Sequence, residues 1–279
     1  MIAWGAALPA PAKLNLFLHV IGRRDDGYHL LQTVFRLIEY CDTLRFEPRT
    51  DGRIRLTRPL EGVAEDDDLT VRAARALQAH VQRPLGATIT LEKRVPIGAG
   101  LGGGSSDAAT TLVALNRLWE IGLPIAELAA IGARLGADVP VFVRGHSAFG
   151  EGIGELLTPV DLSPAWYLVL IPPVAIATRE IFASPDLTRD TKPTTISAFF
   201  ADQICRNDLA DVVVVRYPVV GRYLEWLGQY APARMSGSGS AVFAEFPTED
   251  AARAVRARLR GDMQGFVARG LDRHPLSDC

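Results

Sequence analysis

The chain has 279 residues, enough for one large domain or two ordinary ones. Apolar residues make up 48% of it and charged residues 22%, which excludes disordered, collagen-like and low-complexity chains. The 30 Lys and Arg against 32 Asp and Glu leave a net charge of −2. This charge disfavours a protein that relies on a broad basic surface to hold nucleic acid.

The cysteines and the apolar segments indicate the compartment. Cys41, Cys205 and Cys279 lie far apart and form no CxxC pair, which argues against a zinc site or a disulfide framework and favours a reducing environment. The longest apolar stretch, residues 165–177, is shorter than the ~20 residues that cross a bilayer, and it contains two prolines. The N-terminal segment lacks the basic start and the long apolar core of a targeting peptide. We therefore expect a cytoplasmic protein without a membrane partner.

The first part of the chain alternates apolar and polar residues between turn signals, which predicts several strands. Strands are expected over 14–20, over 33–39, 43–47 and 53–57, which have the pattern of an antiparallel meander, and over 88–93 and 139–144. Helices are expected over 69–81, 105–119 and 125–134. At the start of the longest helix, Ser105, Ser106 and Asp107 are expected to accept hydrogen bonds from first-turn amides.

The pattern changes near Pro159, where we place a domain boundary that divides the chain into residues 1–160 and 161–279. Strands are expected over 166–171, 241–246 and 265–268, and helices over 208–217, 219–230 and 248–259. The four valines at 212–215 suit a strand by propensity, whereas their flanks suit a helix. The second half thus predicts an α+β domain of ordinary size.

A glycine-rich segment lies between a predicted strand and the longest predicted helix. It consists of Pro96, Ile97, Gly98, Ala99, Gly100, Leu101, Gly102, Gly103, Gly104, Ser105 and Ser106. Glycine permits positive φ and close approach of backbone amides to a ligand, and a helix start adds N–H groups without partners. Together these features bind phosphate oxygens, and a merely flexible loop is the less favoured alternative.

The residues around this segment distinguish it from two common classes of phosphate-binding loop. Gly98, Gly100 and Gly103 satisfy GxGxxG, but Lys93 and Pro96 separate them from the preceding strand, unlike the dinucleotide-binding pattern. A Walker A loop is excluded, because no lysine follows the last glycine. Ser106 remains a candidate ligand of a magnesium ion held by the phosphates.

Three further features are candidates for function. A second small loop, residues 235–240 with Gly237, Ser238 and Gly239, precedes a predicted strand. With the glycine-rich segment, it indicates a site between domains, one loop on ATP and the other near the transferred phosphate. Lys13 and Asp138 each interrupt apolar or small residues. Position alone favours an ordinary exposed lysine and a turn-capping aspartate.

Three motifs occur in the order typical of the GHMP kinases, the superfamily named for galactose, homoserine, mevalonate and phosphomevalonate kinases. They are Pro-Ala-Lys-Leu-Asn-Leu at 11–16, the glycine-rich segment at 96–106 and Met-Ser-Gly-Ser-Gly-Ser at 235–240. Along nearly its whole length, the chain most closely resembles the members that act on a cytidine-diphosphate-linked methylerythritol. This closer resemblance rests on Arg23, Asp-Gly-Tyr-His at 26–29, Gly-Leu-Gly-Gly-Gly-Ser-Ser at 100–106 and Gly-Ala-Asp-Val-Pro-Val-Phe at 136–142.

The resemblance implies an α+β kinase of two lobes with ATP and substrate in the cleft between them. The N-terminal lobe would hold a mixed, largely antiparallel sheet with helices, and the C-terminal lobe would be ferredoxin-like. The implied reaction transfers the γ-phosphoryl group of ATP, with Mg²⁺, to the 2-hydroxyl of the methylerythritol moiety, a step of the non-mevalonate isoprenoid pathway. By resemblance, Asp138 takes the hydroxyl proton, while Lys13 orients Asp138 and stabilises charge on the attacking oxygen.

The resemblance also implies a cytidine site. Tyr28 and His29 match positions that hold the cytosine, Phe182 matches the residue on its other face, and Asn15 and Thr178 match positions near polar groups of the substrate. An aromatic face and a polar edge suit a pyrimidine base. Without the resemblance, the sequence favours a locally packed Tyr28 and an exposed His29.

One departure from the family pattern lies on the adenine side. Family members commonly place Asn in the segment that matches residues 66–69, whereas this chain has Asp68. A carboxylate accepts hydrogen bonds but does not donate one unless it is protonated. We expect Lys93 to share the adenine contact, and the substitution to alter ATP affinity or purine choice rather than the reaction.

Three alternatives stay open at the level of sequence. The chain could be another GHMP kinase with a related substrate, a dinucleotide-dependent oxidoreductase on the GxGxxG match, or an RNA-binding module, since the first domain of these kinases resembles folds of ribosomal proteins. An oxidoreductase has no particular need for Lys13 and Asp138. The net charge of −2 argues against RNA binding. The expected partners are therefore ATP and a cytidine diphosphate substrate, not nucleic acid.

Overall fold

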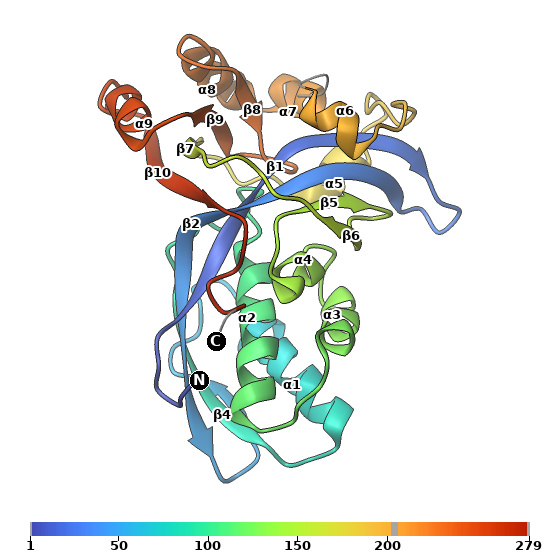
Figure 1. The fold of residues 1–279 in the computed structure, drawn as a ribbon, viewed down its shortest axis with the longest axis vertical. Helices are drawn as coiled ribbons and strands as arrows, with labels where there is room; N and C mark the ends of the chain where they lie inside the picture. The colour runs from blue at the N-terminus through green and yellow to red at the C-terminus, as the bar shows by residue number, and fades with distance from the viewer. Residues whose placement is uncertain (1, 202–205, 278–279) are drawn as a thin grey trace.

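A computed structural model describes residues 2–201 and 206–277, which form two lobes joined by long strands (Figure 1). Ten strands in these residues form one mixed sheet. No helix in the described ranges is both long and apolar enough to cross a bilayer. Cys41 is a free thiol, whereas Cys205 and Cys279 lie outside the described residues.

The N-terminal lobe is built on two long antiparallel strands, which also extend into the other lobe. Its strands are β1 (Leu8–Arg23), β2 (His29–Arg49), β3 (Ile54–Leu56), β4 (Gly86–Glu92), β5 (Ala148–Glu151) and β6 (Leu156–Pro159). Its helices are the short 3₁₀ helix η1 (Glu65–Asp67), then α1 (Leu69–Val81), α2 (Gly103–Leu118), α3 (Ile125–Ala133) and α4 (Val139–Arg144). Helices α1 to α4 gather on one face of the sheet (Figure 1).

The C-terminal lobe is an antiparallel sheet with helices. Its strands are β7 (Trp166–Ile171), β8 (Ala233–Met235), β9 (Val242–Phe246) and β10 (Gln264–Leu271), in the spatial order β10-β7-β9-β8. Its helices are α5 (Thr178–Phe182), α6 (Ile196–Phe200), α7 (Ala210–Arg216), α8 (Pro218–Gly228) and α9 (Glu249–Arg256). This strand order and the helices in the connections β7 to β8 and β9 to β10 confirm the ferredoxin-like prediction.

The two lobes are joined through the sheet. Strand β10 pairs with β7 in the C-terminal lobe and also with β2, through Gly270 opposite Ile38. The domain boundary near residue 160 lies between β6 and β7 and stays a prediction.

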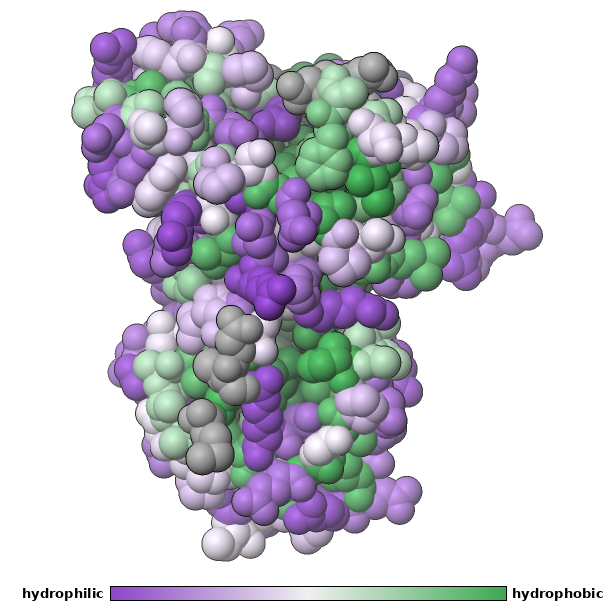
Figure 2. Space-filling view, in the orientation of Figure 1, coloured by the Kyte–Doolittle hydropathy of each residue, from purple (hydrophilic) through white to green (hydrophobic). Residues whose placement is uncertain are grey.

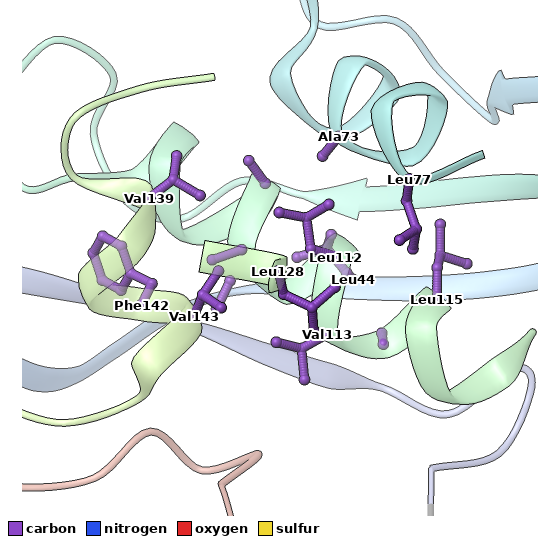
Figure 3. Close-up of a cluster of buried hydrophobic side chains, with 14 of the residues drawn as sticks. Leu44, Ala73, Leu77, Leu112, Val113, Leu115, Leu128, Val139, Phe142 and Val143 are labelled. Carbon is purple, nitrogen blue, oxygen red and sulfur yellow. The ribbon is translucent and has the colours of Figure 1, made fainter. Parts of the chain in front are cut away.

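The core of the N-terminal lobe fixes the helices that approach the site. Leu44 of β2, Leu77 of α1, Leu112 of α2, Leu128 of α3 and Phe142 of α4 belong to one buried cluster (Figure 3). Burial of one such side chain is worth about 1.5–3 kcal/mol relative to exposure. The cluster therefore holds the start of α2 and the start of α4 in a defined relative position.

Two local predictions are wrong. Residues 139–144, expected as a strand, form α4, because Pro140 stands in its first turn and Gly145 ends it at φ 71°. Helix α2 begins at Gly103, two residues earlier than expected, and its N-cap is Gly102, with no side-chain cap. Ser105, Ser106 and Asp107 therefore lie inside the helix.

Other differences concern pairing. The expected strands 33–39 and 43–47 are one strand, β2, and β3 runs parallel to β4, so the predicted antiparallel meander is incorrect. The valines at 212–215 are helical, in α7. The short elements β5, β6, β8, α5 and α6 were not predicted.

The C-terminal turn carries a buried histidine that predicts a pH effect. Burial lowers the pKa of His274 to about 4, and its Nδ1 accepts the Leu276 N–H at 3.0 Å. The unfolded chain takes up a proton at this histidine below about pH 6.5, whereas the folded chain does so only near pH 4. Because the unfolded chain is protonated first, lowering the pH from 8 to 4 is expected to reduce the free energy of unfolding by about 3 kcal/mol through this histidine.

Urea unfolding across this range measures the effect against a matched variant. His274→Asn keeps a carbonyl oxygen for the Leu276 N–H and does not titrate. Its free energy of unfolding is expected to depend less steeply on pH than that of the wild type. Equal pH dependence in the two proteins would contradict the assignment.

Candidate active site

A cavity of about 1160 Å³ is lined by residues of both lobes. The molecule narrows between the two lobes (Figure 2), and the residues that line the cavity come from both sides of this narrowing. Segments far apart in sequence contribute, including β1, the start of β2, the glycine-rich segment, α5 and the loop between β8 and β9. Of the residues predicted for the site, all but Ser106 and Gly239 line this cavity.

The glycine-rich segment is shaped for backbone contact. Gly98, Gly100 and Gly102 have φ of 70°, 74° and 70°, a region that L side chains rarely adopt. Because the helix begins at Gly103, the amides of residues 103–105 have no partner within it. These residues line the cavity. The segment thus presents free N–H groups and the positive end of α2, as an anion requires.

The loop of residues 236–240 packs directly on the glycine-rich segment. Ser236 Oγ donates to the Gly100 carbonyl at 2.9 Å, and Ala241 N–H donates to the Ala99 carbonyl at 3.0 Å. Asn207 also fixes this loop, because its Nδ2 donates to the carbonyls of Met235 and Gly237, both at 2.8 Å. The two loops therefore form one wall, and Asn207 is a supporting residue that the sequence did not indicate.

Lys13 and Asp138, distant in sequence, form an ion pair at the cavity. Lys13 Nζ lies 3.2 Å from Asp138 Oδ2 and donates to Asn15 Oδ1 at 2.5 Å. The lysine side chain is 3% exposed, whereas that of Asp138, at the start of α4, is 32% exposed. The carboxylate is thus open to a bound ligand, while the ammonium group behind it is fixed.

A second charged cluster adjoins the glycine-rich segment, and two of its members, Lys93 and Asp107, also line the cavity. Lys93 Nζ contacts the carboxylates of Asp42 and Asp107, the latter at 2.7 Å, and Asp42 also accepts the N–H groups of Arg94 and Val95. Burial raises the pKa of Asp107 to about 8; Lys93 opposes this shift and Asp42 adds to it. Lys93 is therefore not a surface lysine. Its contacts tie the segment that enters the glycine loop to the helix that leaves it.

Asp68 lies at the start of α1, where its side chain has a structural role. Its Oδ1 accepts the Thr70 N–H at 2.8 Å and also contacts the Thr70 hydroxyl. It is the N-cap of α1, a position where a carboxylate serves as well as an amide. Asp68 also lines the cavity, with Lys93 and Leu69.

His29 and Phe182 also line the cavity and lie against each other with ring centroids 5.1 Å apart. Arg189 Nε donates to His29 Nε2 at 3.1 Å, which leaves the ring proton on Nδ1. Burial, followed by the charges of Arg189 and Arg23, lowers the pKa of His29. Tyr28 is 61% exposed and lines the cavity.

Arg189 is a further residue that sequence reasoning missed. Besides the bond to His29, it donates to the carbonyls of Phe182 at 3.1 Å, Ser184 and Leu187 at 3.0 Å. It therefore fixes the segment after α5 against the start of β2. Thr178, at the start of α5, shares a hydrogen bond of 2.7 Å with Ser238.

Known proteins share this architecture. Residues 68–146 match the model of the GHMP kinases N terminal domain, and residues 197–264 match that of the GHMP kinases C terminal domain. A crystal structure of 4-(cytidine 5'-diphospho)-2C-methyl-D-erythritol kinase superposes with a TM-score of 0.82 at 33% identity, covering 95% of this chain and 99% of that one. The Methanococcus jannaschii mevalonate kinase, at 15% identity, has the same fold, with a TM-score of 0.71 over 97% of this chain and 100% of that one.

Sequence relatives are more similar still. The 4-diphosphocytidyl-2-C-methyl-D-erythritol kinase of Thiobacillus denitrificans is 63% identical over 272 residues, 98% of each chain. The enzyme of the same name from Nitrosospira multiformis is 58% identical over 97% of this chain and 92% of its own. The chain therefore belongs to the 4-diphosphocytidyl-2-C-methyl-D-erythritol kinases, within the GHMP kinases.

Proposed function

We propose that this enzyme transfers the γ-phosphoryl group of ATP to the 2-hydroxyl of 4-diphosphocytidyl-2-C-methyl-D-erythritol, giving the 2-phosphate and ADP. The reaction is a step of the non-mevalonate isoprenoid pathway, and its use of ATP favours the cytoplasm. The observation that carries the proposal is the Lys13–Asp138 ion pair, which shares one cavity with the glycine-rich helix start. A proton acceptor for an alcohol and a cradle for phosphates are the two parts that this reaction needs.

In the proposed mechanism, the amides of the glycine-rich segment bind the phosphates of ATP, and residues 237–239 lie near the group that is transferred. Asp138 accepts the proton of the attacking hydroxyl, and Lys13 holds the carboxylate and stabilises negative charge on that oxygen. Phosphoryl transfer passes through a loose transition state, so positioning and charge stabilisation supply most of the rate. The buried Lys13 ammonium provides both.

We further propose that Mg²⁺ accompanies ATP and that Ser106 is a protein ligand for it. The Ser106 hydroxyl is buried and has no hydrogen-bond partner among the described residues, which fits a group that awaits a ligand. When bound, the metal neutralises charge on the phosphates. Lys93 is proposed to contact the adenine, with Asp68 as its neighbour in the cavity wall.

The cytidine end of the substrate is proposed to lie against Tyr28, His29 and Phe182, with Asn15 and Thr178 near its polar groups. The exposed face of Tyr28 supports a stacking role. The contact between His29 and Phe182 favours a base that lies against this ring pair rather than between the two rings.

The fork of hydrogen bonds from Arg189 leads to a prediction about substrate affinity. Arg189→Lys is expected to raise the KM for the cytidyl substrate by about tenfold, because one ammonium group cannot replace a guanidinium that bonds several acceptors at fixed angles. The KM for ATP should stay within about twofold. Steady-state kinetics measures both constants, and Arg269→Lys, at an exposed pair with Glu39, is the control. An equal rise in both KM values would contradict a local role for Arg189.

The proposed function is tested by ADP release from the purified enzyme with ATP and magnesium. The acceptors are 4-diphosphocytidyl-2-C-methyl-D-erythritol, mevalonate, homoserine and galactose, each at the same concentration. We expect turnover of the first alone. Turnover of another acceptor instead would overturn the substrate assignment, and no turnover with intact ATP binding would reassign the site at Tyr28, His29 and Phe182.

A further inference from the structure

We propose that Thr33 is a positioning residue that sets the direction of the Lys13 ammonium group through Asn15. The inference rests on the function proposed above, in which Lys13 serves the phosphoryl transfer. It comes from a chain of three hydrogen bonds, from Lys13 to Asn15, from Asn15 to Thr33 and from Thr33 to a backbone carbonyl.

The chain begins at a β-bulge in the pairing of β1 with β2. Asn15 stands opposite Phe35 and Leu18 opposite Thr33, so Leu16 and Phe17 together face the single residue Val34. A bulge disrupts the ladder and redirects backbone groups, often beside an active site. Here the Phe17 carbonyl accepts the hydroxyl proton of Thr33.

That hydrogen bond decides how the next group is oriented. A threonine hydroxyl has one proton to donate. Because the Thr33 hydroxyl donates it in the hydrogen bond to the Phe17 carbonyl, its oxygen can only accept further hydrogen bonds. It accepts from Asn15 Nδ2 at 2.9 Å. The amide of Asn15 is therefore oriented with its carbonyl oxygen toward Lys13 Nζ, 2.5 Å away.

Lys13 depends on this orientation of the Asn15 amide. An ammonium group only donates, so a flipped Asn15 amide would place N–H groups against it. The hydrogen bond to Asn15 Oδ1 holds the ammonium group where it forms the ion pair with Asp138, Nζ lying 3.2 Å from Oδ2. Lys13 and Asn15 are 3% exposed and Thr33 is 2% exposed. Because they are so well buried, bulk water does not replace a lost member of the chain.

The test is Thr33→Val, which keeps the shape of the side chain and removes the hydroxyl. Its Asn15 amide loses the acceptor that orients it, so Lys13 is held less precisely, and we expect kcat to fall by about 10- to 100-fold. The KM for ATP should change less than about threefold, and kcat should fall more than the KM for the cytidyl substrate rises, because the main effect of Thr33 is on the position of Lys13 at the reacting atoms. Thr33→Ser, which restores the hydroxyl, should return kcat to within about threefold of wild type.

Three controls keep the outcomes distinct. Thr111→Val removes another buried hydroxyl, whose one bond among the described residues is to the Asp107 carbonyl in its own helix, and should leave kcat unchanged. Thermal unfolding of each variant separates loss of fold from loss of rate; if Thr33→Val does not fold, Thr33→Cys replaces it, because sulfur is a weak acceptor. Wild-type kcat near zero with the cytidyl substrate would reject the proposed function itself. Normal wild-type turnover with an unaffected Thr33→Val, or with Thr33→Ser as slow as Thr33→Val, would reject only the role of Thr33.

Discussion

Asp138→Asn is expected to lower kcat by about 10²–10⁴-fold, the contribution of a well-placed general base. Asparagine has nearly the shape of aspartate but cannot take a proton from the attacking hydroxyl at neutral pH. The Asp138 side chain is part-exposed and its carboxylate caps nothing in α4, so the fold should persist. ADP release measures kcat and KM, and thermal unfolding supplies the control for folding. Activity within about threefold of wild type would contradict a role of Asp138 as the base.

The double variant with Lys13→Met tests whether the pair acts as one unit. If Lys13 works partly by holding Asp138, its substitution should cost much less in the Asp138→Asn background than in the wild type. Lys13→Met removes the ion pair with Asp138 and the hydrogen bond to Asn15 Oδ1. The free energy of unfolding of this variant must therefore be measured as well. Fully additive losses in kcat would show that the two residues act independently.

The parts of this site that the sequence predicted are those with local signals. The glycine-rich segment is recognisable because positive φ and a helix start demand particular residues within a few positions of each other. Lys13 and Asp138 carried no such signal of their own. Their pairing depends on β1 and α4 meeting in space, and only the family motifs indicated it.

The residues that were missed act through contacts across long stretches of chain. Arg189 lies 160 positions from His29, and Asn207 donates to the Met235 carbonyl, 28 positions later, at the start of the loop that it supports. Periodicity and propensity describe neighbours within one element and do not report such pairs. The failure at α4 has a different and largely local cause. Its valines favour a strand, but Pro140, Gly145 and the packing of Phe142 in the core favour a helix.

Gly100→Ala is expected to damage both the stability of the enzyme and its use of ATP. A Cβ at this position would lie 2.2 Å from the Ser236 carbonyl oxygen and 3.1 Å from that of Gly239, both of them backbone atoms. The residue also has φ 74°, which strains any residue with a side chain. The loop of residues 236–240 must therefore move away, breaking the bond from Ser236 to the Gly100 carbonyl. We expect a loss of about 2–4 kcal/mol in the free energy of unfolding and a fall of more than about tenfold in kcat/KM for ATP.

Gly122→Ala separates the two causes of that loss. Gly122 has φ 77°, close to that of Gly100, but nothing lies within 4 Å of an added Cβ, and it does not line the cavity. Gly122→Ala should therefore lower the free energy of unfolding only by the conformational strain, about 1–2 kcal/mol, and should keep the wild-type kcat/KM for ATP. Urea unfolding and initial rates at varied ATP measure the two effects. If both variants lose the same stability and neither loses ATP turnover, the contact between the two loops is not what shapes the proposed phosphate site.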